Sequence, residues 1–194
     1  GLNLVAPQKW LSAMDAANKL YAGAAYFGLN YIIRHASTIF CMSDIKDINT
    51  DISLYESEPG KWRSALYLYD AIEGGVGYAE KIFDRIEEVL RFCRDIIENC
   101  ECGSGCPSCI PPLPPGVDSR ELEDFLVESN AAVECTRSLL TALLEKRIIL
   151  PELVINRTPL ARTDAPPVDL EKKRMSGKLK RAARILRDKR ERLH

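Results

Sequence analysis

Four cysteines lie within ten residues of this chain, and they constrain its fold more than any other feature: Cys100, Cys102, Cys106 and Cys109. Four thiolates at this spacing suit a tetrahedral divalent metal, and zinc is the usual ion in such sites. Gly103 and Gly105 permit the tight turns that so short a loop needs, and Pro107 stiffens the last turn. Because four sulfurs fill the coordination shell, the spacing predicts a structural zinc site, not a catalytic one.

Two other interpretations of the cysteines are a disulfide framework and a redox pair. Seven cysteines is an odd number, Cys100 and Cys102 are too close to pair comfortably, and residues 1–10 lack a secretory signal. Redox motifs use two cysteines near a βαβ unit, whereas this loop holds four. We therefore expect reduced thiols, a cytoplasmic protein and bound zinc. Cys41, Cys93 and Cys135 are expected to be buried core residues.

The length of 194 residues allows one domain with a sizeable core plus appendages. Apolar residues make up 46%, and no apolar stretch approaches the roughly 18 residues that span a bilayer. We expect a domain over residues 1–155, a proline-containing linker over 156–168 and a basic helix or tail over 169–194. The chain begins with Gly1 and not Met, which favours a fragment of a longer protein.

Apolar periodicity predicts an α+β fold, in which a small β-sheet is packed by long amphipathic helices. Helices are expected over residues 12–37, over 77–99 leading straight into Cys100, and over 118–146 with a break near Ser129 and Asn130. Strands are expected over 38–42, 50–55 and 64–71, the last two joined through Glu58, Pro59 and Gly60. Residues 111–116 predict a stiff, extended exit from the cysteine loop.

Charge divides the chain unevenly. Residues 171–194 carry eleven Lys or Arg against three acidic residues, a net charge of +8, while the rest carries −9. The tail can therefore contact nucleic-acid phosphates, and a basic helix docked on another part of the protein is the alternative. The candidate nucleic-acid-binding residues are Lys172, Lys173, Arg174, Lys178, Lys180, Arg181, Arg184 and Arg187.

No catalytic residue is predicted. Gly74, Gly75 and Gly77 form a GGxG turn where a phosphate loop could lie, but neither a following Lys-Ser/Thr pair nor GxGxxG spacing is present, so a tight strand-to-helix turn is preferred. His35 lies on an apolar helix and is expected to be a core histidine. Asp44, Asp47 and Asp51 lack the glycine and distal Glu of a calcium loop.

The run YLYDAIEGGVGYAEKIFDRIEEVLRFCRDIIENCECGSGCPSCI, residues 67–110, resembles the MrfA zinc-binding domain family. The matching elements are a strand ending in Tyr69 and Asp70, the GGxG turn, an amphipathic helix and the closing CxCxxxCxxC motif. Residues 35–47 are similar to the strand and acidic turn that precede this block in the family. These domains occur toward the carboxyl end of superfamily 2, DEAD/DEAH-like DNA helicases.

The resemblance implies that the four cysteines hold Zn²⁺, and that the chain is an accessory domain of an ATP-dependent DNA helicase. Such a domain would brace the motor and aid DNA engagement in DNA repair, with DNA and helicase motor domains as partners in cis or in trans. The sequence holds no Walker A lysine and no DEAH box, so this chain alone is not expected to hydrolyse ATP. The alternative is a noncatalytic scaffold subunit that binds a separate helicase, as in an antiphage defence complex. A stand-alone zinc enzyme is a third interpretation, which the filled coordination shell disfavours.

Overall fold

The fold is that of a computed structural model, which describes residues 1–58, 61–111 and 120–155. The elements are β1 (Leu2–Leu4), α1 (Gln8–Ala17), α2 (Tyr21–Cys41), β2 (Ile48–Glu58), β3 (Lys61–Asp70), α3 (Tyr78–Asp84), α4 (Ile86–Glu98), α5 (Arg120–Glu128) and α6 (Ala131–Glu145). A three-stranded antiparallel sheet and helices thus form the predicted α+β fold. Among the described residues, no helix combines the length and apolar character that a membrane span requires.

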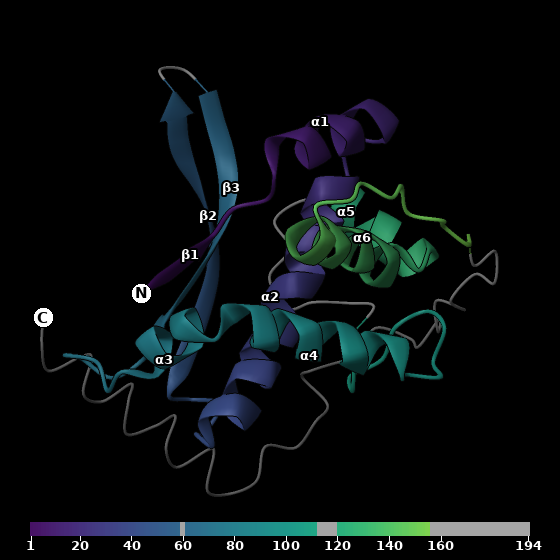
Figure 1. Ribbon diagram of the computed structural model, residues 1–194. Helices are drawn as coiled ribbons and strands as arrows, with labels where there is room; N and C mark the ends of the chain where they lie inside the picture. Colours follow the sequence, from purple (N-terminus) through teal and green to yellow (C-terminus); the bar gives the residue numbers. More distant parts are fainter. Residues whose placement is uncertain (59–60, 112–119, 156–194) are drawn as a thin grey trace, which may run out of the picture. The chain divides into compact units, whose positions relative to one another are not determined.

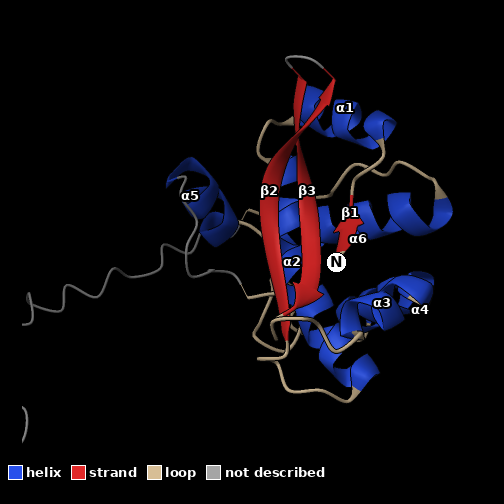
Figure 2. Cartoon of the chain, turned by 90° about the vertical axis from the view of Figure 1, so that its left-hand side faces the viewer, coloured by secondary structure: helices blue, strands red, loops and turns tan. Residues whose placement is uncertain are grey.

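The sheet has strand order β1-β3-β2, so β3 lies in the middle. Leu2 pairs with Leu68 and Leu4 pairs with Leu66, while β2 pairs with the other edge of β3. Figure 2 shows the strands in front of the long helix α2. Leu66 and Leu68 are fully buried, and each such burial contributes roughly 1.5–3 kcal/mol.

Helix α2 is the centre of the domain. Ten of its residues are buried, because apolar or small side chains surround most of the helix. The helices α1, α4 and α6 and the strand β2 all contact it. Helix α6 approaches closely at Gly28, where an added Cβ would lie 2.8 Å from the carbonyl oxygen of Ala132. The hydroxyl of Thr136 donates a hydrogen bond across the same contact to the carbonyl of Ala25.

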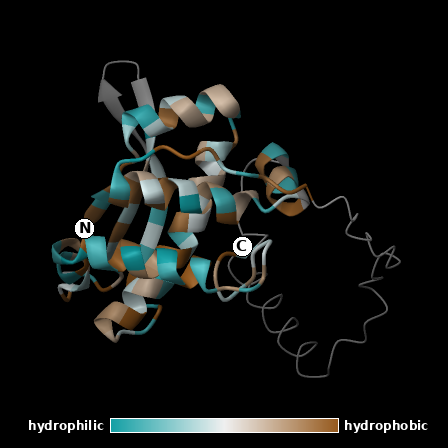
Figure 3. Ribbon diagram, turned by 45° about the vertical axis from the view of Figure 1, so that its right-hand side comes forward, coloured by the Kyte–Doolittle hydropathy of each residue, from teal (hydrophilic) through white to brown (hydrophobic). Residues whose placement is uncertain are grey.

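Helix α4 has two distinct sides. Val89, Leu90, Cys93 and Ile97 are buried, as the predicted stripe requires. The exposed side is coloured mostly hydrophilic in Figure 3 and carries the ion pairs Arg85–Glu88 and Arg91–Glu87. The helix ends at Glu98 and leads directly into the cysteine loop.

Several predicted elements differ from the observed ones. Residues 38–42 were expected to be a strand, but they continue α2 to Cys41, and the side-chain hydroxyl of Thr38 donates to the carbonyl of His35 one turn earlier. The helix expected over 12–37 is interrupted at Asn18, whose side chain accepts a hydrogen bond from the N–H of Leu20. The helix expected over 77–99 is two helices that meet at Arg85, and β1 was not predicted.

Other predictions agree with the structure. The break near Ser129 and Asn130 separates α5 from α6, and the two strands of the β2–β3 hairpin are longer than expected. Cys41, Cys93 and Cys135 are all buried. His35 is half-buried beside Tyr31 and not in the core, so that prediction was wrong. The start of the helix at Asp118, most of the extended exit, the linker and the basic tail lie outside the described residues.

Candidate metal centre

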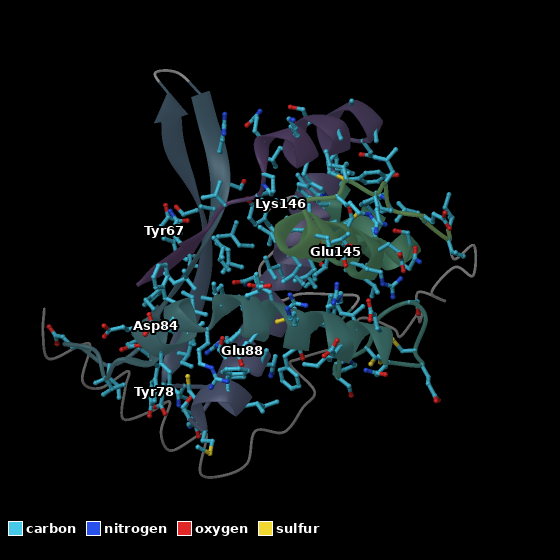
Figure 4. The ribbon with its side chains drawn as sticks, in the orientation of Figure 1. Tyr67, Tyr78, Asp84, Glu88, Glu145 and Lys146 are labelled. Carbon is cyan, nitrogen blue, oxygen red and sulfur yellow. The ribbon has the colours of Figure 1, made fainter. Side chains whose placement is uncertain are left out.

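The four cysteines of the loop lie together in space, and the side chains around them are drawn as sticks in Figure 4. All four Sγ atoms are within 4.8 Å of one another. The Sγ–Sγ distances are 3.6 Å from Cys100 to Cys106, 3.5 Å from Cys102 to Cys109 and 3.8 Å from Cys106 to Cys109. Sulfurs bound to a zinc ion at about 2.3 Å in a tetrahedron are about 3.8 Å apart. A disulfide needs about 2.05 Å, so the arrangement suits a shared metal ion and not sulfur–sulfur bonds.

Backbone turns bring the sulfurs together. The N–H of Ser104 donates to the carbonyl of Cys102, and the N–H of Cys109 donates to that of Cys106. Gly103 and Gly105 have φ of 71° and 103°, in the region that favours glycine. At Gly105 a Cβ would also lie 2.6 Å from the carbonyl oxygen of Ile110. The predicted role of these two glycines is therefore confirmed.

The environments of the sulfurs differ. The backbone N–H groups of Ser108 and Cys109 lower the pKa of Cys106 to about 6, which favours the thiolate that binds metal. Burial raises the pKa of Cys109 to about 12. A buried neutral thiol is a poor ligand, but a divalent cation between the sulfurs favours the charged form. The donor set therefore fits zinc, which would be held by Cys100, Cys102, Cys106 and Cys109.

Helices α2 and α6 form the surface on which the loop lies. Ile110 is fully buried, and its side chain reaches the position where Gly28 would carry a Cβ. The hydroxyl of Tyr31 donates a hydrogen bond of 2.7 Å to the carbonyl of Pro107. Burial raises the pKa of Tyr31, and negative charge on Cys106 and Cys109 raises it further, so the hydroxyl keeps its proton.

Tyr31 and Gly28 were not identified from the sequence as parts of this site. Tyr31 lies within the helix expected over residues 12–37, and it is 76 residues from Pro107. A tyrosine hydroxyl on an otherwise apolar helix was the available signal, since such a group needs a polar partner. Nothing in the spacing of the cysteines indicates which helix they contact.

The GGxG turn is occupied by a side chain of the protein itself. The carboxylate of Asp70 accepts hydrogen bonds from the N–H groups of Val76, Gly77 and Ala79. These N–H groups would face a phosphate in a phosphate-binding loop. The structure therefore agrees with the preferred interpretation of this segment as a strand-to-helix turn.

The candidate nucleic-acid-binding residues were placed in the tail and lie outside the described residues. Within the described part of the chain, the structure brings no other predicted site residue to the cysteine loop. Asp44 and Asp47 accept backbone hydrogen bonds within their own turn. The site near α4 consequently consists of the four thiols and the α2–α6 surface beneath them.

Comparison with known proteins shows what this part of the chain is similar to. Residues 29–110 match the MrfA Zn-binding domain. The ATP-dependent helicase YprA of Bacillus subtilis is 29% identical over 94 residues, which are 48% of this chain and 12% of that protein. The protein MJ1572.1 of Methanocaldococcus jannaschii is 38% identical over 50 residues, which are 26% of this chain and 45% of that protein.

A solved structure is also similar to part of the chain. The crystal structure of the DUF1998 helicase MrfA bound to DNA has 26% sequence identity and a TM-score of 0.44, over 56% of this chain and 14% of that one. The chain thus spans less than half the length of each of these relatives.

Proposed function

We propose, from the premise that residues 29–110 of this chain are an MrfA Zn-binding domain, that the chain is a zinc-stabilised accessory domain of an ATP-dependent DNA helicase. The observation that carries the proposal is the coincidence of this match with four sulfurs spaced for a tetrahedral ion. The similarity to YprA over 94 residues supports the helicase context.

Zinc has a structural role in this proposal. Bound to four thiolates, the ion supplies cross-linking and charge neutralisation but no open coordination position. The four cysteines connect the end of α4 to the surface of α2 and α6 through Ile110 and Pro107. Because the four sulfurs are not held together in the unfolded chain, metal binding contributes directly to the free energy of folding.

The domain acts by bracing the helicase motor and aiding DNA engagement during DNA repair. ATP hydrolysis depends on residues that this chain does not contain, since its sequence has no Walker A lysine and no DEAH box. The basic residues from Lys172 to Arg192 supply the positive charge for a contact with DNA phosphates. The motor domains and DNA are accordingly the proposed partners, and the cytoplasm the proposed location.

The test uses the full protein encoded by the reading frame that contains this chain. Its DNA-dependent ATPase and unwinding rates are measured for wild type and for Cys106→Ser, with Cys93→Ala as the matched control. We expect Cys106→Ser to lose zinc and to reduce unwinding at least tenfold, while Cys93→Ala keeps its zinc and most of its unwinding. Unwinding at the wild-type rate by protein without zinc would exclude the bracing role.

A second candidate is a noncatalytic scaffold subunit that binds a separate helicase. It is favoured by MJ1572.1, because 50 matching residues make up 45% of that protein, which is therefore short. A related segment thus occurs in a chain with little room for motor domains. Copurification separates the two functions, since a scaffold captures a distinct ATPase whereas an accessory domain is joined to its motor in one polypeptide.

A further inference from the structure

The contact between Tyr31 and Pro107 joins the central helix to the cysteine loop. Tyr31 lies in α2, and its hydroxyl donates to the Pro107 carbonyl at 2.7 Å. Pro107 lies between Cys106 and Cys109, in the turn closed by the hydrogen bond from the N–H of Cys109 to the carbonyl of Cys106. The contact therefore holds the part of the loop that supplies two of the four sulfurs.

The peptide that Tyr31 contacts lies between two of the sulfurs. The carbonyl of Pro107 belongs to a planar peptide within the turn from Cys106 to Cys109. With its oxygen held by Tyr31, this peptide fixes the turn in which the two sulfurs lie 3.8 Å apart. The spacing of these two sulfurs is thus set from α2.

Two residues of α2, His35 and Gly28, help to fix the positions of Tyr31 and of the cysteine loop. The ring of Tyr31 contacts the ring of His35, with centroids 4.5 Å apart, one turn further along α2. Gly28, one turn earlier, lies beneath the buried side chain of Ile110. Residues three apart on a helix share one face, so Gly28 and Tyr31 together hold the loop at Ile110 and at Pro107.

We propose that Tyr31 is a positioning residue of the metal centre, which acts through the Pro107–Ser108 peptide to hold the sulfurs of Cys106 and Cys109 at the spacing that a shared metal ion needs. The inference rests on the zinc site of the proposed function and adds a residue outside the cysteine motif. Groups that orient metal ligands typically change metal affinity 10- to 100-fold when removed. Because Tyr31 contacts a backbone carbonyl and not a ligand atom, the lower end of that range is expected.

The experiment compares Tyr31→Phe with Tyr21→Phe in the same helix. Both variants remove one hydroxyl and keep the ring, but Tyr21 packs on Phe125 of α5 instead of contacting the cysteine loop. Zinc affinity is measured by competition with a chromophoric chelator. We expect Tyr31→Phe to bind zinc about tenfold more weakly than wild type. Tyr21→Phe is expected to bind zinc as wild type does.

The absorption spectrum of the Co²⁺-loaded chain gives a second readout. The positions of the thiolate–cobalt bands depend on the geometry and charge of the sulfurs, whereas a general loss of stability lowers their intensity alone. We expect shifted bands for Tyr31→Phe only. Unchanged affinity and unchanged bands in Tyr31→Phe would overturn the inference and leave the zinc site intact. A wild-type chain that binds no zinc would overturn the proposed zinc role itself, and the inference with it.

Discussion

The carboxylate of Asp70 accepts a hydrogen bond of 2.7 Å from the backbone N–H of Ala79, and so connects the end of β3 to the first turn of α3. The position that precedes this helix is Gly77, which has no side chain to cap it. Asp70 supplies the missing cap from nine residues away and also accepts bonds from the N–H groups of Val76 and Gly77.

The Asp70 cap predicts an acid-sensitive contribution to stability. Burial raises the pKa of Asp70, but the N–H groups of Ala79, Gly77, Val76 and Tyr78 outweigh it and hold the pKa below its ordinary value of 3.8. Since the folded pKa is depressed, the contribution is complete above the unfolded value and disappears as pH falls through the folded one. Asp70→Asn keeps one acceptor oxygen and replaces the other with an NH₂ group, so it is expected to lower the free energy of unfolding at pH 7 by less than the roughly 1 kcal/mol that loss of a whole cap costs.

The measurement is urea unfolding of wild type and Asp70→Asn from pH 7 down to acid. Zinc also leaves the thiolates in acid, so the relevant quantity is the difference between the two proteins. The difference between the two free energies of unfolding should shrink as the pH falls below 3.8, the ordinary pKa of Asp70. Glu73→Gln, an exposed change in the same turn, is the control. A difference that stays constant with pH would contradict the assignment of the cap.

The metal centre predicts that one mutation can lower the zinc content of the chain and that another can lower its stability without loss of zinc. Cys102 is the exposed member of the four cysteines, so Cys102→Ser removes a ligand without leaving a core cavity. Zinc content is expected to fall from one ion per chain, and treatment of wild type with chelator should first increase amide exchange near residues 100–110. Cys93→Ala should be less stable, because the buried side chain leaves a cavity, yet keep its zinc. Equal loss of zinc in both variants would show that the metal merely follows overall stability.

The sequence predicted elements whose cause is local and missed those whose cause is distant. The stripe of α4 and the glycines of the cysteine loop follow from spacing and backbone freedom alone. Residues 38–42 are apolar and partly β-branched, so they resemble a strand, but packing of α2 extends the helix to Cys41. The strand β1 has three residues and exists through its pairing with Leu66–Leu68, which no local pattern indicates.

In the candidate site too, the residues that are close in sequence were predicted and those that are brought together by packing were not. Four ligand candidates were found because they lie within ten residues of sequence. Tyr31 was missed because its contact with Pro107 depends on how α2 packs against a loop far along the chain. The break at Arg85 was missed because Ile82 and Ile86 keep the apolar spacing of one continuous helix across it.

Gly28 predicts a steric limit on helix packing. A Cβ at this position would lie 2.1 Å from Oγ1 of Thr136 and 3.0 Å from Cδ1 of Ile110. Gly28→Ala should therefore be destabilising by roughly 1–3 kcal/mol, despite the better helix propensity of alanine. In Gly23→Ala the new Cβ meets only the side chain of Leu122 at 3.3 Å, so this variant should be neutral or slightly stabilised. Thermal unfolding of the pair tests the difference, and equal effects would contradict the close approach of α2 and α6.

The hydrogen bond of Trp10 predicts that the protein becomes less stable when the buried indole N–H loses its acceptor. Its indole N–H donates to the hydroxyl of Ser138 at 2.9 Å, and Ser138 in turn donates to the carbonyl of Ile149. Ser138→Ala leaves the fully buried Trp10 without this acceptor and should cost about 1–3 kcal/mol. Unfolding is followed by tryptophan fluorescence in a Trp62→Phe background, so that Trp10 is the reporter. Ser12→Ala on exposed α1 surface is the control and should change little. An unchanged stability in Ser138→Ala would mean that the indole N–H finds another partner.

The basic tail predicts a salt-dependent contact with DNA. Removal of residues 169–194 takes away eleven Lys or Arg and should weaken binding to a single- or double-stranded oligonucleotide, by a factor that shrinks as salt rises. The slope of log affinity against log salt should become shallower by about 0.7–0.9 for each phosphate that is no longer neutralised. Replacing Lys178, Lys180 and Arg181 with Gln is a milder test, in which the slope changes by up to three such phosphates. An affinity and a salt slope that both survive truncation would exclude a DNA contact by the tail, because neutralised phosphates release counterions from the nucleic acid.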